Sequence, residues 1–441
     1  MTGYFRNCRD LKYDKKKQER KNMRSVTWRK TWLVGIWIIL FLLQNPLQQH
    51  LEPFQYLDEI FGLLIIPLAF LRFFQRKLTL GWTREKVIFG ALLLIFWISG
   101  WCGVIAYRYQ PFLNSAQDAY VNIKFFLALG ASYLMFACED IDFDSIKKKL
   151  WPLLNVITLA LFVLCVADQC FKIFDADMRG GLRAVKLFYS AYTILVGNCV
   201  LLCGIYFWLY KEKGKKIILP LILLAFVMLS TRRVKAMGVV ACVLLIYLLV
   251  FQKRQKISKK VKIFAVAVFI LAGAAAAYQI VSYYFLMGVE SARAVLTIGA
   301  PFIAWDHFPF GTGWGTYGSA FSVEPYSPVY GMYRMAGVWG LSPDFPDFVS
   351  DTFWPMILGE CGFFGFLAIL GVLFLLAKKI FSMKKDKSIF ASGLVPIAYL
   401  LISSTSESAF ANPIAVPLAF WLGFLFAQEK VRERKGQEAE E

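Results

Sequence analysis

The chain has 441 residues, of which 58% are hydrophobic and 17% aromatic, and its formal net charge is +19. This apolar content is too high for an ordinary soluble domain, and the alternating ten-residue strands of an outer-membrane barrel are absent. The positive charges stand beside long apolar stretches, which favours membrane orientation over nucleic-acid binding. With two histidines and nine cysteines at unrelated spacings, the sequence predicts no metal site and no cofactor.

Apolar stretches long enough to cross the hydrocarbon layer of a bilayer as helices recur along the whole chain. We therefore predict an all-α polytopic membrane protein with about twelve transmembrane helices. The predicted spans are residues 32–43, 57–74, 87–106, 119–137, 151–170, 187–210, 217–229, 234–251, 263–282, 353–377, 389–404 and 411–427.

The basic residues are distributed unevenly between the two ends of these spans. With the N-terminus in the cytoplasm, about 38 of the 49 Lys and Arg residues fall on the cytoplasmic side. We predict a basic cytoplasmic tail at 1–30, an integral membrane domain at 31–427 and a disordered cytoplasmic tail at 428–441. The outward cations work against this signal, so we interpret them as a site for a polyanion at the outer leaflet. They are mainly Arg179, Arg183, Lys186, Arg232, Arg233, Lys235, Arg293 and Arg334.

One connection is long: residues 283–351, between the ninth and tenth spans, form a predicted extracytoplasmic loop rich in Gly, Pro and aromatic residues. An amphipathic helix over 294–304 is expected to open it. Arg293 stands just before this helix as a ligand candidate, although Glu290 could simply pair with it. The spaced glycines of 309–317 could aim backbone amides at an anion, or form only a turn between two loop helices.

The turn between the seventh and eighth spans carries Arg232, Arg233 and Lys235 within four residues. Such a cluster at a membrane surface is costly without partners. The guanidinium groups could grip phosphate with two parallel hydrogen bonds, or the side chains could only extend to the interface.

Two acids are candidates for proton transfer. Asp351 stands at the outer mouth of the tenth span, and Glu360 lies about two and a half turns inside it. A carboxylate that faces an outer cavity could take a proton from a sugar hydroxyl. Glu360 could instead be the partner of a buried arginine. The hydroxyl-rich segment 403–408 is expected mainly to cap the last helical hairpin.

Three segments together resemble the O-antigen ligase and polymerase family of bacterial membranes. Ser230-Thr231-Arg232-Arg233 is similar to the family's Thr/Ser-then-Arg signature. Arg293 followed by Pro309-Phe310-Gly311-Thr312-Gly313-Trp314-Gly315 resembles its arginine with a later proline and spaced glycines. Ser350-Asp351-Thr352-Phe353-Trp354 through Glu360-Cys361-Gly362-Phe363-Phe364-Gly365 resembles the entry to its next span.

The resemblance implies a metal-independent glycosyltransferase at the outer face of the bacterial cytoplasmic membrane. Its donor would be an oligosaccharide linked to undecaprenyl diphosphate. Other implied partners are membrane lipid and polysaccharide-assembly proteins, without nucleic acid. Ligases of the family carry a histidine where this chain carries Asp351, so a polymerase of capsule or O-antigen repeat units is favoured. A ligase, or a flippase for the same lipid-linked oligosaccharide, remains the alternative.

Each candidate residue has an expected role in this reaction. Asp351 or Glu360 would activate the acceptor hydroxyl, and Arg293 would stabilise charge as the lipid diphosphate leaves. Residues expected to bind the substrate are Arg179, Arg183, Arg232, Arg233 and Arg334 at the diphosphate, with Trp314 and Tyr317 stacked on sugar faces.

Overall fold

The computed structural model describes residues 29–74, 83–137, 141–179, 181–252 and 287–440, together with isolated residues between 263 and 282. This part of the chain is mostly helical, and its two strands form one antiparallel hairpin, β1 (Met178–Arg179) and β2 (Leu182–Arg183). By length and composition, seven of the described helices can cross a membrane, or up to eight if one bent pair counts as a single span. These are the features of a helical membrane protein.

The candidate spans alternate with shorter elements along the chain. The seven are Arg29–Gln48; Glu52–Leu71, which combines η1 (Glu52–Tyr56), α2 (Leu57–Leu63) and most of α3 (Ile65–Phe74); α4 (Arg84–Tyr107); α5 (Phe112–Ala137); α6 (Phe143–Phe171); α10 (Val234–Phe251); and α14 (Trp354–Ser382) with η7 (Met383–Lys385). The pair bent by 57° joins α7 (Tyr192–Trp208) to the segment Tyr210–Ser230, which contains α8 (Tyr210–Lys213), η2 (Gly214–Ile217) and α9 (Ile218–Ser230). The remaining helices are η5 (Gly288–Glu290), α12 (Ala292–Asp306), η6 (Ala320–Ser322), α13 (Pro328–Met332), α15 (Lys387–Ser403) and α16 (Ala415–Glu440).

The described helices differ from the predicted spans at several places. The basic tail as far as residue 28 and most of the predicted span 263–282 lie outside the described residues. The predicted sixth and seventh spans correspond to α7 and α9, which have 17 and 13 residues. The C-terminal tail was predicted to be disordered, but α16 continues as a helix to Glu440. Lys430 and Glu433, 3.9 Å apart on successive turns, support this extension.

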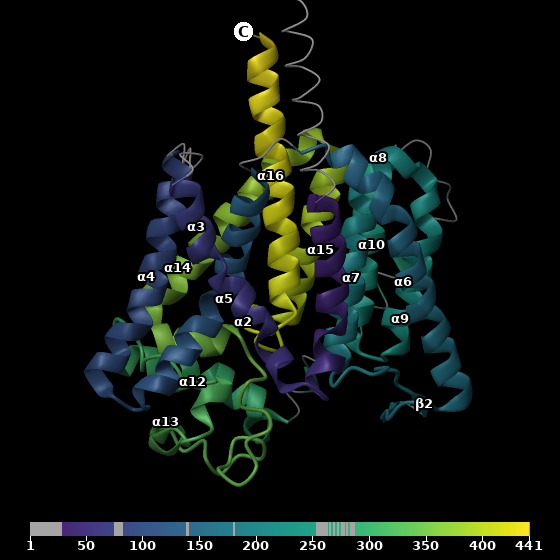
Figure 1. Cartoon of the computed structure of the whole chain (residues 1–441). Helices are drawn as coiled ribbons and strands as arrows, with labels where there is room; N and C mark the ends of the chain where they lie inside the picture. Colours follow the sequence, from purple (N-terminus) through teal and green to yellow (C-terminus); the bar gives the residue numbers. More distant parts are fainter. Residues whose placement is uncertain are drawn as a thin grey trace, which may run out of the picture.

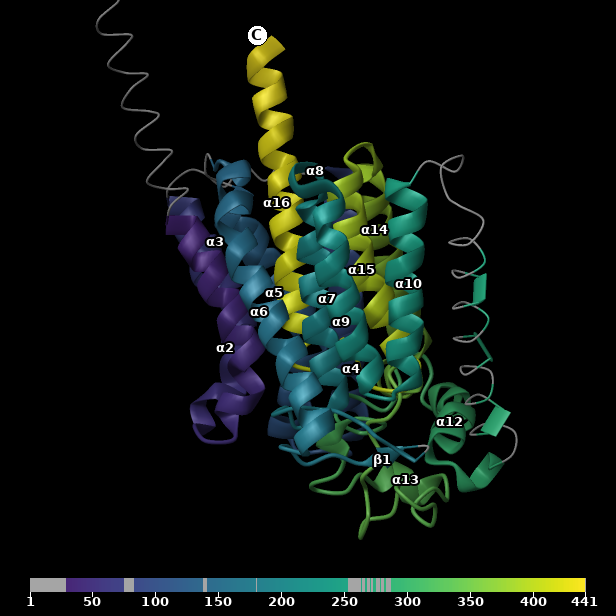
Figure 2. The same cartoon turned by 90° about the vertical axis from the view of Figure 1, so that its right-hand side faces the viewer.

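The long helices run side by side in one bundle with two different ends (Figures 1 and 2). At one end α16 projects beyond its neighbours, and we call this the tail end. At the opposite end lie α12, α13 and the β1–β2 hairpin, and we call this the loop end. Small residues let the helices approach closely: a Cβ atom on Gly423 of α16 would lie 2.3 Å from the carbonyl oxygen of Leu129 in α5.

The long connection after residue 286 has a small apolar core of its own. Leu296 and Ile303 of α12 are fully buried in it, together with Tyr317, Tyr330 and Leu341. The amphipathic helix predicted at the start of this loop is confirmed as α12. The connection is therefore a folded segment that holds its residues in place at the loop end.

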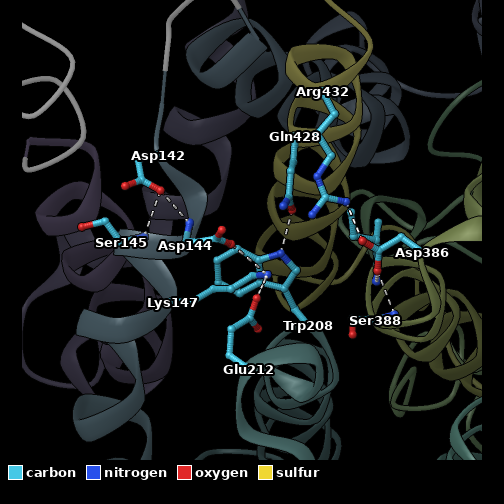
Figure 3. Close-up of polar contacts among 11 residues, drawn as sticks. Asp142, Asp144, Ser145, Lys147, Trp208, Glu212, Asp386, Ser388, Gln428 and Arg432 are labelled. Carbon is cyan, nitrogen blue, oxygen red and sulfur yellow. Dashed lines mark hydrogen bonds and ion pairs between the residues drawn. The ribbon is translucent and has the colours of Figure 1, made fainter. Parts of the chain in front are cut away.

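Ion pairs between helix ends close the tail end of the bundle (Figure 3). Lys147 of α6 lies 2.6 Å from Glu212 of α8, and Arg432 of α16 lies 2.5 Å from Asp386. Asp386 also accepts hydrogen bonds from the first backbone amides of α15, so it caps that helix and fixes it to α16. These contacts join α6 to α8 and α15 to α16.

Candidate anion-binding site at the loop end

The turn between α9 and α10 presents its three cations in different ways. α9 ends at Ser230, and Arg232 adopts a left-handed backbone conformation with a φ of 54°, which is typical of a residue that terminates a helix. Arg233 then precedes α10, and Lys235 lies in its first turn. Because the chain reverses at Arg232, its side chain is exposed, whereas those of Arg233 and Lys235 are partly buried.

Two guanidinium groups share one aromatic ring beside this turn. The guanidinium carbon of Arg233 lies 4.4 Å from the centroid of the Tyr192 ring, and that of Arg179 lies 5.7 Å from it. Such cation–π contacts hold both cations near the first residue of α7. Within the described part of the chain, the Nε atoms of both arginines are buried without a hydrogen-bond partner.

The negative charge around these two arginines is small. Asp177 lies 3.7 Å from Arg179, but its side chain is 60% exposed. Burial and then the positive charge of Arg179 lower the pKa of Arg233, although Tyr192, Asp177 and Glu407 oppose the shift. A bound anion would therefore stabilise this pair of cations.

A second group of charges adjoins the first. Lys235 Nζ lies 3.4 Å from Glu407 Oε1, and a terminal nitrogen of Arg293 lies 2.8 Å from Asp351 Oδ2. Lys235 is close enough to Arg293 and Asp351 for both charges to act on it, and Glu407 acts on both Lys235 and Arg233. Glu407 therefore links the two groups.

We define the cation cluster as Arg179 and Arg233 at the Tyr192 ring together with Lys235 and Arg293, with the acids Glu407 and Asp351 at its edge. Its members come from segments that are far apart in the sequence: the β hairpin, the start of α7, the α9–α10 turn, the start of α12, the end of the long loop and the α15–α16 connection. Four of the predicted residues, Arg179, Arg233, Arg293 and Asp351, are thus brought into one neighbourhood.

The other three predicted substrate-binding arginines are either paired with a buried acid or exposed. Arg183 donates to Asp168, whose carboxylate is fully buried, at 3.0 Å. Its charge is thereby neutralised inside the protein, so the predicted ligand-binding role is replaced by a structural ion pair. Arg232 and Arg334 are exposed, each with a left-handed backbone conformation.

The two aromatic residues predicted to stack on sugars are core residues instead. Trp314 is completely buried, packs edge to face against Phe96 and donates to the carbonyl oxygen of Trp97 at 3.2 Å. Tyr317 is also completely buried and donates to the carbonyl oxygen of Leu296 at 2.6 Å. Neither ring presents a face on which a sugar could stack, because large aromatic side chains in a long loop also supply the apolar area of its core.

The glycine-rich segment does direct its amides at acidic side chains, but these belong to the chain. The amide of Gly315 donates to Asp118 at 2.9 Å, and those of Thr316 and Tyr317 donate to Glu360 at 2.9 and 3.1 Å. The segment reaches these acids because Gly313, with a φ of 98°, packs directly on the backbone of α4.

The sequence left two alternatives for Glu360, a base that faces an outer cavity or the partner of a buried arginine. Its side chain is completely buried, accepts the two loop amides and faces the carboxyl group of Asp118. The structure shows neither alternative, because the side chain is buried and its partners are backbone amides and not an arginine. Asp351, partly exposed at the edge of the cation cluster, is the acid that a ligand can reach.

Sequence reasoning missed Tyr192 and Asp118, and it gave the segment that contains Glu407 mainly a capping role, with sugar contact as the lesser alternative. Asp118 stands one residue before a predicted span and Tyr192 lies within another. Their residue types therefore carried a weak signal, since acids and tyrosines are common at span ends. Their roles depend on side chains from other helices.

Among the described residues, no group of three or more His, Cys, Asp or Glu side chains could hold a metal ion. In comparisons with known proteins, no family model and no curated protein matches this chain.

Proposed function

We propose that the chain is a polymerase of lipid-linked oligosaccharide repeat units, similar to the O-antigen ligase and polymerase family. It would transfer a glycan from an undecaprenyl-diphosphate donor to a lipid-linked acceptor. This proposal rests on the pair Arg179 and Arg233, whose buried Nε–H groups have no partner among the described residues. Lys235 and Arg293 lie beside this pair. A diphosphate ester has the negative charge and the neighbouring oxygen atoms that planar guanidinium groups bind with parallel hydrogen bonds.

The proposal includes the orientation of the molecule in a bacterial cytoplasmic membrane. We propose about twelve spans, with both termini in the cytoplasm and the loop end outside. The uneven distribution of basic residues supports this orientation. The cation cluster then lies at the outer face, where a diphosphate head group of a lipid carrier would be reached directly.

The reaction follows from the charges at the cluster. An acceptor hydroxyl oxygen forms a bond to the anomeric carbon of the donor, and the bond between that carbon and the diphosphate oxygen breaks. Undecaprenyl diphosphate leaves with the bonding electrons, and the cations stabilise its growing negative charge. A terminal nitrogen of Arg293 lies 2.8 Å from Asp351 Oδ2. The diphosphate of the donor would compete with Asp351 for this guanidinium group. The released Asp351 carboxylate takes the hydroxyl proton.

The test is substitution of the paired arginines in cells that depend on this chain for surface polymer. Arg233→Ala and Arg179→Ala should each reduce polymer by at least about a hundredfold, comparable to removal of one preorganised donor. Arg233→Lys should restore little, because an ammonium group cannot form two parallel bonds to phosphate. The readouts are glycan length and the amount of protein in the membrane.

Arg108→Ala is the control for loss of an arginine outside the cluster. Arg108 is exposed in the loop after α4, and its backbone is left-handed like that of Arg232. It should leave polymer length unchanged. Normal polymer from both the Arg179→Ala and Arg233→Ala proteins would refute the proposed role of the cation cluster.

A flippase for the same lipid-linked oligosaccharide is the alternative that one observation favours. Lys124 of α5 and Asp58 of α2 form a buried ion pair at 2.5 Å, and charges inside spans often mark transport pathways. Deletion of the gene distinguishes the functions. Loss of polymer with surface display of single repeat units indicates a polymerase, whereas loss of display with accumulation inside the cell indicates a flippase. Polymer that stays attached to its lipid carrier indicates a ligase.

A further inference from the structure

α12 carries an exposed apolar face that the site at its N-terminus does not use. Ile298, Phe302 and Trp305 follow one another at helical spacing, and their side chains are 55%, 63% and 71% exposed. Lys and Arg are absent from this face. Three large apolar side chains exposed in a row on one helix indicate a contact with something other than water.

The opposite face of α12 is already occupied. Leu296, Ala300, Ile303 and Ala304 are buried against the core of the long loop and α14. The helix cannot turn its exposed face inward without losing these contacts. Among the described residues, no other segment covers the exposed face.

The exposed face continues onto the surface of a candidate membrane span. Phe308, just after α12 and 58% exposed, lies with its ring 6.0 Å from that of Phe364 in α14. Phe364, Leu367 and Phe374 are large apolar side chains exposed on α14, which is long and apolar enough to cross a bilayer. The Phe308 ring also lies 6.5 Å from that of Trp305, so the exposed apolar side chains of α14 continue through Phe308 to α12.

We infer that α12 is an interfacial membrane helix, and that its Ile298, Phe302 and Trp305 face lies against the acyl chains of the leaflet at the loop end. The residue types agree with this position, because Trp and Phe are favoured where apolar chains meet polar head groups. In Figures 1 and 2, α12 lies at the level where the long helices end. Arg293, the second residue of α12, then stands at the depth of the lipid phosphates. This inference rests on the membrane assignment and not on the proposed glycan reaction.

The test uses nitroxide spin labels in liposomes of phosphatidylethanolamine and phosphatidylglycerol. Labels at Phe302→Cys and Trp305→Cys, in a cysteine-free chain, should collide more often with oxygen, which partitions into lipid, than with a water-soluble nickel chelate. They should match Leu367→Cys on α14. Trp339→Cys, at a residue 65% exposed in the long loop, is the control in water and should show the reverse preference.

Two outcomes would overturn the inference. Labels at 302 and 305 that behave like the label at 339 would show that the face meets water. Labels shielded from both reagents would show that protein covers it, either a second copy or another segment of this chain.

Lipids brominated on their acyl chains give a second measurement that leaves the native cysteines in place. Bromine quenches the fluorescence of tryptophans that contact acyl chains. Trp305→Phe should reduce the quenched fraction of the total emission, whereas Trp339→Phe should not. An unchanged quenched fraction in the Trp305→Phe protein would reject the inference even if the cysteine-free chain does not fold.

Discussion

At the scale of single residues, the two candidate acids differ in what surrounds them. Asp351 is partly exposed and pairs with Arg293, whereas Glu360 is buried and accepts backbone amides. Burial without a route to substrate makes Glu360 a support for the glycine-rich segment. Asp351 therefore keeps the role of proton acceptor in the proposed reaction, and the two positions can be separated by substitution.

Glu360→Gln should leave the protein stable and active. Glutamine keeps the side-chain oxygen that accepts from Thr316 and Tyr317, and its amide can donate to Asp118. Glu360→Ala removes both hydrogen bonds and should cost about 1–3 kcal/mol for each buried amide left unpaired. Thermal unfolding in detergent, with polymer length measured in cells, checks both variants. If Glu360→Gln abolishes chain growth in a stable protein and Asp351→Asn does not, Glu360 is the base.

The contacts of the Asp386 carboxylate should make the stability of the folded protein depend on pH. Burial raises its pKa, but Arg432 and the amides of Ile389 and Ser388 outweigh this, so the pKa lies below its ordinary value. A carboxylate with a lowered pKa contributes stability that is complete above the unfolded-state pKa of about 4 and is lost as the pH falls through the folded-state value. Asp386→Asn should therefore lower the melting temperature at neutral pH, and the difference from wild type should shrink in acid. A difference that stays constant from about pH 6 to pH 3 would contradict this assignment.

At the scale of elements, the long loop is held on the bundle by backbone packing at Gly313. A Cβ atom there would lie 2.4 Å from the backbone nitrogen of Val104, at a φ of 98°. Gly313→Ala should therefore destabilise the protein by about 1–3 kcal/mol or more and make the loop sensitive to protease. Gly337→Ala is the control, because a Cβ atom there meets no atom within 4 Å. Equal protease resistance of the two variants would show that the loop does not depend on this contact.

The α2–α5 contact depends on a buried ion pair. Lys124 lies 2.5 Å from Asp58, which also accepts from Gln44 at 2.7 Å. Lys124→Met leaves Asp58 uncompensated and should cost about 3–5 kcal/mol, measured by unfolding in detergent. The double variant Lys124→Met with Asp58→Asn should recover much of this loss. Without such recovery, the packing of the lysine stem and not its charge would be the stabilising contribution.

At the scale of the whole molecule, the separation of a loop end from a tail end makes the proposed topology testable. Single cysteines at Ser342 in the long loop and at Lys215 between α8 and α9, in a cysteine-free chain, are labelled with a membrane-impermeant maleimide. Intact cells should be labelled at 342 only, and broken cells at both positions. Labelling of 215 alone in intact cells would invert the molecule and remove the cation cluster from the outer face.

The sequence by itself determined the class of the molecule. Apolar stretches of membrane-spanning length, basic residues gathered beside them and one long aromatic loop are local properties, so they can be identified before folding. The helix at 294–304 was predicted for the same reason, since its periodicity is contained in its own residues. Span boundaries also depend on capping: α6 begins at Phe143, where the side chain of Asp142 caps it, and not at the predicted residue 151.

Only the tertiary structure decided which candidate residues belong together. Arg179, Arg233 and Tyr192 meet through three separate segments, and their neighbourhood depends on how α7, the β hairpin and the α9–α10 turn pack. The same packing buried Trp314 and gave Glu360 the amides of the glycine-rich segment. Residue type indicates what chemistry a side chain can perform, but burial and partners select its role, and both are set by contacts between residues far apart in the chain.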